Sequence, residues 1–499
     1  MKIKNEILLF ALNASFAHQA LGALTLAAHV NLYLNDEICS VLECNINERD
    51  DEILYKLYEN AKDKKIVGFS CYIWNIKKML KFAGNLKNLL PEIYIIFGGP
   101  EVSYYEKAEF YALYPFVDLL IQGEGEKPLL ELFAKPPFER GAGGIAESDV
   151  NELLYKNAEN YHTVYYESSR GCPFNCSYCI SGIDNNKIRA KSVDLVLDEL
   201  KIIEEKYYNC ENSKINIIKF CDRTFNFDIK RANELYKNLI GRADEYKKYN
   251  KKLLPYQFEI YPNLFDKESF EILKNAPKDL FHMEIGLQSL NLKTLEAIGR
   301  KNTDINQAVE NIAKIKSLKN IPVHVDLIAG LPYEDVESFI NGFNLLYEKT
   351  KADFIQIGFL KLLLGTRIRK ETEIHGYIYE ESPPYSILKN NYMNFEDIAF
   401  LRDVEKMYKR YSSNSYTKSF NYIYNTYFIG NVFEIFKLLA IYWRNNNLFD
   451  KSVSQKDAFE AFFNGLKELE IFDRNDLIIL IELLENDFYE HDGKKLKLR

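Results

Sequence analysis

The sequence predicts an α/β protein in three parts. An N-terminal doubly wound parallel sheet is expected over residues 1–135, a partial (β/α)6 TIM-type barrel over 161–375, and an all-helical part over 376–499. Two successive series of short apolar runs alternating with helical stretches predict the two sheets. Prolines and glycines concentrated near Pro136 and Gly144 predict a linker over 136–160, and the loss of strand patterns after residue 375 predicts the helical part.

The first series alternates regularly as far as residue 122. Its strands are continuous apolar runs, and its helices show apolar residues at helical spacing. Parallel strands joined by helices bind their ligands at the carboxyl ends of the strands, so the turns after the strands are the candidate site. The expected strands are 6–12, 38–43, 65–70, 93–97 and 117–122, and the expected helices are 19–34, 51–62 and 76–90.

The second series has six strand–helix units, more than one doubly wound half and fewer than the eight of a closed barrel. A partial barrel fits this number, again with its site at the carboxyl ends. Beyond it, Pro383 and Pro384 interrupt the chain and residues 394–499 read as helices. The expected strands are 163–168, 215–220, 256–261, 281–287, 323–328 and 354–359, and the expected helices are 193–206, 229–242, 267–275, 292–298 and 336–351.

Composition excludes several classes of protein. With 47% hydrophobic and 27% charged residues, the chain is neither disordered nor fibrous. A net charge of −8 argues against sequence-blind nucleic-acid binding, which needs a basic surface. The most apolar stretch, 427–443, is broken by polar residues, and the first residues lack the apolar core of a signal peptide. We therefore expect no membrane association and a cytoplasmic location, where cysteines stay reduced.

The strongest local signal is a cysteine triplet directly after the first barrel strand. Cys172, Cys176 and Cys179 follow a C-x3-C-x2-C spacing. Thiolates are soft ligands that suit zinc or an iron–sulfur cluster, but structural zinc takes four ligands and no fourth Cys or His lies nearby. Three ligands on a four-iron cluster leave one iron open to another molecule.

With this triplet, the sequence resembles the radical S-adenosylmethionine (SAM) superfamily. The resemblance implies a 4Fe-4S cluster that binds SAM through its open iron and cleaves it to a 5′-deoxyadenosyl radical. It also implies SAM-binding roles for residues near the triplet or at successive strand ends, although ordinary turns are the alternative for each, and Asp222 alone could cap the next helix. These residues are Tyr178, Asp222, Glu284, Gln288, Ser289 and Gly330.

The order of the first two parts resembles the cobalamin-binding class of that superfamily. The class places a Ser or Thr and a Gly-Gly pair at strand ends against the cobalamin tail, which assigns Ser70, Gly98-Gly99 and the Gly123-Glu124 turn to cobalamin. The first loop departs from the usual D-x-H-x-x-G pattern, because Phe16 and Leu21 replace its Asp and Gly. His18 is therefore either a cobalt ligand or a structural or substrate-facing residue.

These observations favour a cobalamin-dependent radical SAM enzyme that transfers a methyl group to an unactivated carbon. The alternatives are a non-methylating cobalamin-dependent rearrangement or cyclisation, a methylthiotransferase acting on tRNA, and a cofactor-carrying protein without catalysis. The methylthiotransferase would need a second cluster, for which Cys39, Cys44 and Cys71 are poorly spaced. Expected partners are a small-molecule or natural-product-like substrate and an electron donor such as flavodoxin or ferredoxin.

No residue can be assigned as a catalytic acid or base. Cys210 and Cys221 are expected to be packing residues rather than ligands. His375, at the border of the helical part, is expected at the surface. The helical part itself resembles an uncharacterised extension found on some cobalamin-class radical SAM proteins.

Overall fold

The computed structural model describes residues 6–15, 17–34, 37–132, 147–183, 188–248, 252–469 and 471–498. Its N-terminal part is a five-stranded sheet in the order β2-β1-β3-β4-β5, and every neighbouring pair is parallel. The strand order reverses beside β1, which is the topological switch of a doubly wound fold. The predicted sheet is thus confirmed. Its strands are β1 (Ile7–Asn13), β2 (Cys39–Asn45), β3 (Ile66–Ser70), β4 (Tyr94–Gly98) and β5 (Leu119–Ile121).

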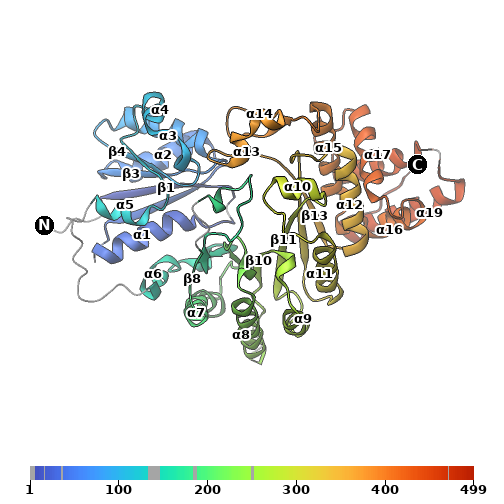
Figure 1. The fold of residues 1–499 in the computed structure, drawn as a ribbon, viewed down its shortest axis with the longest axis horizontal. Coiled ribbons are helices and arrows are strands. Elements are labelled where there is room, and N and C mark those ends of the chain that lie inside the picture. Colours follow the sequence, from blue (N-terminus) through green and yellow to red (C-terminus); the bar gives the residue numbers. More distant parts are fainter. Residues whose placement is uncertain are drawn as a thin grey trace.

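Helices cover both faces of this sheet, because successive residues of each strand point to opposite sides. Ile7 and Leu9 of β1 pack with one set of helices, whereas Leu8 and Phe10 pack with the other. The first set comprises α1 (Leu21–Leu34) and α5 (Glu126–Glu131), and the second comprises α2 (Asp50–Ala61), α3 (Ile76–Leu89) and α4 (Lys107–Leu113). This domain is blue in Figure 1.

The second sheet has six parallel strands in the order β13-β12-β11-β10-β9-β6, as the second series predicts. Helices pack on its outer face, and the sheet forms the green and yellow centre of Figure 1. Its strands are β6 (Thr163–Tyr166), β9 (Ile217–Phe220), β10 (Tyr256–Ile260), β11 (Phe281–Gln288), β12 (Val323–Ala329) and β13 (Phe354–Phe359). Its helices are α7 (Val193–Asn209), α8 (Ile229–Lys248), α9 (Lys267–Lys274), α10 (Leu292–Ala297), α11 (Ile305–Ser317) and α12 (Val336–Thr350); the sequence analysis missed α11.

The inner face of this sheet is polar. Along β11 buried apolar residues alternate with partly exposed ones, and the partly exposed set includes Glu284 and Gln288. The same alternation places Lys219 of β9, Glu259 of β10 and Asp326 of β12 among the partly exposed residues. Since bulky apolar side chains fill the interior of a closed barrel, a polar interior indicates a place for a ligand.

Between the sheets, the predicted linker is only partly described. Its glycines and prolines, from Pro136 to Gly144, lie outside the described residues. Its second half holds α6 (Glu147–Leu154), which packs against α1 and α7. The domain limits given above remain predictions.

After the barrel, a short hairpin precedes five helices. The hairpin strands are β14 (Ile378–Tyr379) and β15 (Ile387–Lys389), and two short helices, α13 (Arg367–Lys370) and α14 (Thr372–His375), lead into them. The predicted helical region beyond residue 394 is confirmed. It consists of α15 (Phe395–Tyr411), α16 (Thr417–Tyr427), α17 (Val432–Asn445), α18 (Gln455–Lys467) and α19 (Arg474–Asp492).

These helices cover the edge of the barrel sheet. The Ile355 amide on edge strand β13 donates a 2.8 Å hydrogen bond to the Tyr408 hydroxyl of α15. Tyr408 also packs against Phe343 of α12 and Phe354 of β13. The helical part and the barrel therefore share one apolar core, and a strand edge that could pair with another chain is covered.

Candidate active site

The cysteine triplet lies on the loop after β7 (Ser169–Arg170), which pairs with β8 (Arg189–Ala190). The Cys172 sulfur is 3.6 Å from the Thr224 hydroxyl, and the Ser181 amide donates to the Cys179 sulfur over 3.4 Å. Burial raises the pKa of the Cys176 thiol, and the nearby Arg300 guanidinium opposes that rise. Iron binds the thiolate form, so cluster binding would release the proton of this thiol.

The arrangement of the thiols fits a cluster better than a single ion. All three cysteines are partly exposed and unpaired, and they lie close enough for the charges of Cys172 and Cys179 to act on Cys176. Within the described ranges, no three His, Cys, Asp or Glu side chains are close enough together to hold one metal ion. A four-iron cluster holds its thiolates farther apart than one ion does, because each cysteine binds a different iron.

Neighbouring barrel segments fix the triplet loop from two sides. The Ser177 amide donates to the Ile298 carbonyl after α10, and the Ser177 carbonyl accepts from the Ile368 amide of α13, each over 2.9 Å. Phe174 stacks on Tyr261 at a centroid distance of 4.2 Å. The burial of Tyr178 raises its pKa, and its hydroxyl lies beside the Cys176 thiol. The loop is thus positioned before any cluster binds.

Asp222 holds the segment that directly precedes the cysteine triplet. Its buried carboxylate accepts hydrogen bonds from the amides of Ser168 and Ser169, over 2.9 and 2.8 Å, and from the Ser168 hydroxyl. Burial nevertheless raises its pKa to about 6, against the effect of these donors. Asp222 does not cap the next helix, because Asp228 accepts the first amides of α8. Its contacts are those of a positioning residue.

Two of the predicted SAM residues lie on the inner face of β11. Glu284 pairs with Lys219 over 2.8 Å and accepts from the amide of Gln257. Gln288 ends the strand with a left-handed backbone, φ 75°. The Arg300 side chain holds the backbone between them by donating to the Gly286 carbonyl over 2.7 Å. Glu284 and Gln288 thus face the region into which the triplet loop leads.

Ser289 and Gly330 have contacts different from those expected. The Ser289 hydroxyl is buried and donates to Glu334 over 2.5 Å. A Cβ on Gly330, with φ 90°, would lie 2.7 Å from Ile387, so the segment that approaches this glycine closely is β15 of the hairpin. Both residues shape the carboxyl end of the sheet through protein contacts.

Two carboxylates of the inner face have no hydrogen bond or ion pair in the described part of the chain. Glu259 lies opposite Glu284 in the sheet register, and Asp326 lies opposite Gly286 on the other side of β11. Burial, followed by the charges of Glu284 and Glu259, raises the pKa of Asp326 to about 7. Burial also raises the pKa of Glu259, against the attraction of Arg223 and Lys219. Partly buried, unpaired carboxylates with raised pKa values mark a candidate binding site. Sequence analysis did not select them, although strict alternation along β10 and β12 would have indicated their direction.

The residues expected to hold cobalamin form one row at the carboxyl edge of the first sheet. Ser70 is paired in register with Gly98, and Gly98 with Ile121, two residues before Gly123. A Cβ on Gly123 would meet nothing within 4 Å, so this turn borders open space, as a tail-binding edge requires. Gly99 is needed for a different reason: with φ 113°, its Cβ would lie 2.5 Å from the Cys71 carbonyl oxygen. Trp74, half exposed beyond the same edge, is an aromatic residue that the sequence analysis did not single out.

His18 connects the two sheets. Its Nδ1 is 2.6 Å from the Tyr165 hydroxyl on β6, and its ring stacks on Tyr165. Burial lowers the pKa of His18, and the charge of Lys219 lowers it further, so the neutral imidazole is favoured. Phe16, which replaces the usual Asp, lies outside the described residues. The contact with Tyr165 supports the structural reading of His18.

Glu124 faces the barrel rather than the space at the strand ends. It pairs with Arg189, and Arg170 lies 3.7 Å from it. Arg170 also pairs with Glu126 and with Glu167, each over 2.6 Å. Arg170 lies on β7, two residues before Cys172, so these ion pairs connect the cobalamin-side turn with the triplet loop. No local sequence pattern indicates this role of Arg170, because its partners Glu124 and Glu126 lie more than 40 residues away in the sequence.

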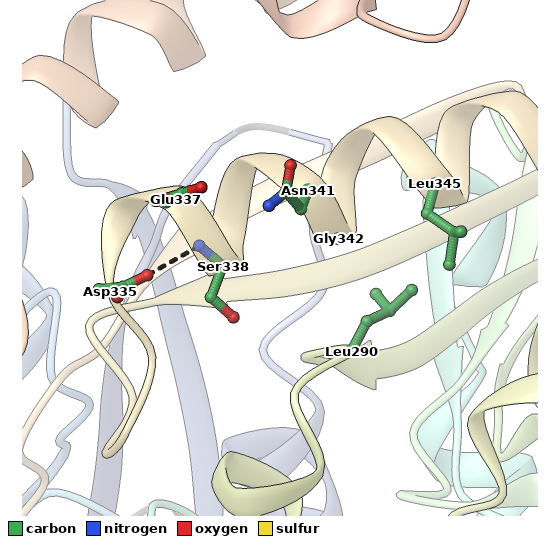
Figure 2. A pocket seen from close by; sticks show the side chains of 7 residues that line it. All are labelled: Leu290, Asp335, Glu337, Ser338, Asn341, Gly342 and Leu345. Carbon is green, nitrogen blue, oxygen red and sulfur yellow. Dashed lines mark hydrogen bonds between the residues drawn. The ribbon is translucent and has the colours of Figure 1, made fainter.

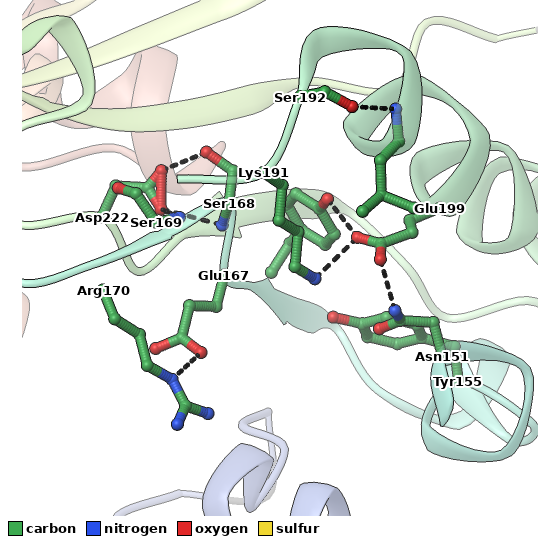
Figure 3. A network of polar contacts seen from close by, with 12 residues as sticks. Asn151, Tyr155, Glu167, Ser168, Ser169, Arg170, Lys191, Ser192, Glu199 and Asp222 are labelled. Carbon is green, nitrogen blue, oxygen red and sulfur yellow. Dashed lines mark hydrogen bonds and ion pairs between the residues drawn. The ribbon is translucent and has the colours of Figure 1, made fainter. Parts of the chain in front are cut away.

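A cavity of about 420 Å³ lies at this junction, lined by α1, α5, α6 and the β7–β8 ribbon. Figure 3 shows its polar network, in which the buried Glu199 accepts from Asn151 over 2.6 Å and from Lys191 over 2.8 Å. A second cavity, of about 500 Å³, lies along α12 and is lined by Leu290, two residues after β11, and by residues between Asp335 and Leu345 (Figure 2).

The remaining predictions have mixed outcomes. Cys39, Cys44 and Cys71 are buried in the first domain, as expected of packing residues, and burial raises the pKa of Cys39 to about 12. His375 is buried rather than at the surface, and its Nδ1 lies 3.2 Å from the Tyr392 hydroxyl, so that prediction is wrong. None of the helices in the described part of the chain has the length and apolar character that crossing a bilayer requires.

Comparison with known proteins identifies the domains. The profile of the radical SAM superfamily matches residues 166–346, and that of the B12 binding domain matches residues 8–133. The chain thus carries a B12 binding domain followed by a radical SAM domain. A third profile, a protein of unknown function (DUF4080), matches residues 373–497. These domains imply a 4Fe-4S cluster, SAM and cobalamin as the cofactors of this radical SAM protein, in agreement with the residues that fit them.

Two curated relatives are methyltransferases by name. The 2-(S-pantetheinyl)-carbapenam-3-carboxylate methyltransferase of Streptantibioticus cattleyicolor is 26% identical over 360 residues, 63% of this chain and 49% of the relative. The cobalamin-dependent radical SAM methyltransferase TokK of Streptomyces tokunonensis is 23% identical over 366 residues, 64% of this chain and 50% of the relative. The radical SAM protein described here thus matches about half the length of each relative.

Solved structures of one enzyme match nearly the whole chain. The one with the higher TM-score is the apo form of the cobalamin-dependent S-adenosylmethionine radical enzyme OxsB, with a TM-score of 0.60 and 14% identity, covering 98% of this chain and 84% of that one. At this identity the likeness concerns the fold, and it extends through the helical region.

Proposed function

We propose that this protein cleaves SAM reductively at a 4Fe-4S cluster and transfers a methyl group from cobalamin to an unactivated carbon of a small-molecule substrate. The observation that carries the proposal is the direct contact between the two binding edges. The carboxyl ends of both sheets are joined directly, through His18 with Tyr165 and through Arg170 with Glu126. A substrate between the two edges would be within reach of both cofactors.

Each part of the site has a distinct task in this proposal. Cys172, Cys176 and Cys179 bind the cluster, and when SAM is bound there it supplies a carbon radical by reductive cleavage. Glu284 and Gln288 orient SAM from the inner face of β11. Asp222, with its three hydrogen bonds to the loop before the triplet, positions the cluster ligands rather than touching SAM.

The first sheet holds cobalamin at the row formed by Ser70, Gly98 and Gly123. His18 orients Tyr165 and the loop after β1. The two named relatives support methyl transfer over other cobalamin-dependent radical reactions, because both are methyltransferases by name and they are similar over 63% and 64% of this chain. Ribosomal protein uS12 methylthiotransferases (RimO) are also among the relatives, at 22–25% identity. Methylthio transfer would need a second cluster, however, and Cys39 and Cys44 stand at opposite ends of β2, so they do not form such a site with Cys71.

Cofactor content and SAM cleavage test the proposal directly. The protein is purified anaerobically, reconstituted with iron, sulfide and hydroxocobalamin, and analysed for metals. We expect about four irons and one cobalt per chain. With SAM labelled in its methyl group and a reductant, we expect 5′-deoxyadenosine and labelled methylcobalamin. Four irons without cobalt would refute the cobalamin role, and about eight irons would favour methylthio transfer. We place the enzyme in the cytoplasm, where a flavodoxin or ferredoxin could reduce it.

A further inference from the structure

Part of the triplet loop is exposed at the molecular surface. Pro173 and Asn175 are exposed, whereas Ser177 is buried beneath them. The segment after α10 touches this exposed part, since a Cβ on Gly299 would lie 2.6 Å from the Asn175 carbonyl oxygen. On the other side, the Arg367 guanidinium of α13 donates to the Ala297 carbonyl over 3.0 Å. The end of α10 and the start of α13 therefore frame the surface nearest the cluster.

This frame carries exposed basic residues. Lys293 is the second residue of α10, Lys301 follows the end of that helix, and Arg367 and Lys370 lie one turn apart on α13; all four are exposed. In the described part of the chain, Lys293, Lys301 and Lys370 have no ion-pair or hydrogen-bond partner for their ammonium groups. Many other lysines of this protein are paired with a carboxylate, such as Lys56 with Glu48. We call the four residues Lys293, Lys301, Arg367 and Lys370 the basic frame.

Acidic residues only partly offset the basic frame. Glu296, Asp304 and Glu373 are exposed in the same two segments, and Glu371 lies 3.4 Å from Arg367. Together, residues 291–304 and 366–376 hold six Lys or Arg residues and four Asp or Glu residues. Arg300, buried beneath the frame, adds a further positive charge next to Cys176. The local excess of positive charge contrasts with the net charge of −8 of the whole chain. A partner that is itself acidic would be repelled by most of this protein and attracted here.

We infer that the basic frame is the docking surface of a small acidic electron-carrier protein, with a flavin or iron–sulfur centre, that reduces the cluster. The inference rests on the proposed function, which requires one electron for each SAM cleaved. The reduced carrier loses one electron, the cluster gains it, and no bond or proton is exchanged. Docking at the frame would bring the carrier against the exposed side of the loop that holds the three cluster cysteines.

The test compares two reductants on a charge-reversed variant. Lys293, Lys301 and Lys370 are each changed to Glu, and Arg367 is kept because it contacts the α10 carbonyl. The rate of 5′-deoxyadenosine formation is measured with flavodoxin, reduced by its NADPH-dependent reductase, and separately with dithionite-reduced methyl viologen. A matched control changes Lys451, Lys495 and Lys497, exposed lysines of the C-terminal region, to Glu.

We expect the flavodoxin-driven rate at limiting flavodoxin to fall on the order of tenfold or more in the frame variant, because charge attraction raises association rates by about 10 to 10³. The viologen-driven rate of the frame variant, and both rates of the control variant, should match the unaltered enzyme. Salt should slow the flavodoxin-driven reaction of the unaltered enzyme and of the control variant, but not that of the frame variant. An unchanged flavodoxin-driven rate, or an equal fall with both reductants, would overturn the inference. Absence of deoxyadenosine with either reductant in the unaltered, cluster-loaded enzyme would instead refute the proposed function.

Discussion

The ion pairs of Arg170 give the sharpest test of how the two cofactor domains are held together. Arg170 is on β7 of the barrel, and its partner Glu126 begins α5 of the cobalamin-binding domain, 2.6 Å away. Its second partner, Glu167, lies in the barrel at the same distance. Changing Arg170 to Gln removes the shared cation and leaves Glu124, Glu126 and Glu167 close together. We expect the contact between the domains to open more often.

The magnitude follows from burial. A hydrogen bond to a charged group contributes roughly 1.5–3 kcal/mol when water is excluded. The Arg170 side chain keeps 33% of its surface exposed, so solvent screens part of this energy, and fully exposed pairs contribute about 0–1 kcal/mol. We therefore expect local opening to become easier by about 1–2 kcal/mol, which corresponds to a factor of about 5–30 in the open population.

Hydrogen–deuterium exchange measures that opening where it occurs. Peptides covering α5 and β7 should exchange about 5–30 times faster in Arg170→Gln, while peptides from α16 to α19 keep their protection. Arg49→Gln is the matched control, because Arg49 also pairs with an aspartate, Asp51, but keeps 74% of its side-chain surface exposed. If both variants behave alike, or if protection falls equally throughout the chain, the reasoning is wrong.

Three further predictions concern the cofactors. Replacing Cys172, Cys176 and Cys179 with Ala should abolish iron binding and leave cobalamin binding intact, as metal analysis and optical spectra would reveal; retained iron would contradict the ligand assignment. Asp222→Asn offers one acceptor oxygen to three donors, and an unsatisfied buried donor costs about 1–3 kcal/mol, so a chelator should remove iron faster than from the unaltered protein. Because the pKa of Asp326 is about 7, its ionised fraction rises from about 10% at pH 6 to about 90% at pH 8. The added negative charge should tighten binding of the cationic SAM over this range, measured by calorimetry, and Asp326→Asn should remove that part of the pH dependence.

Strand ends were predictable from the sequence because buried parallel strands are nearly continuous apolar runs. The run Lys65–Ser70 became β3, and the run ending at Gly98 became β4. From these two alone, Ser70 and Gly98 were expected at one edge, and the register places them opposite each other. The order of the strands within each sheet could not be inferred from the sequence. The position of the residues at the carboxyl edge did not depend on that order.

The direction of side chains at that edge was not predictable, because it depends on tertiary contacts. Glu124 turns to Arg189 across the domain boundary, a contact between residues far apart in sequence. Gly330 suggested close approach to a ligand, yet Ile387 of the later hairpin occupies that place. In both cases the local pattern identified a special backbone position correctly, and a distant segment decided what the position contacts.

The hairpin that begins the region of unknown function is part of the site rather than an appendage. Besides closing over Gly330, it buries Tyr385, whose hydroxyl donates to Glu101 of the first domain over 2.6 Å. Burial raises the pKa of Glu101, and the Tyr385 hydrogen bond opposes that rise. One short segment therefore touches the carboxyl ends of both cofactor-binding sheets. Since the helices that follow share a core with the barrel, they fix this segment in place, and the spacing of the two cofactor edges depends on all three parts of the chain.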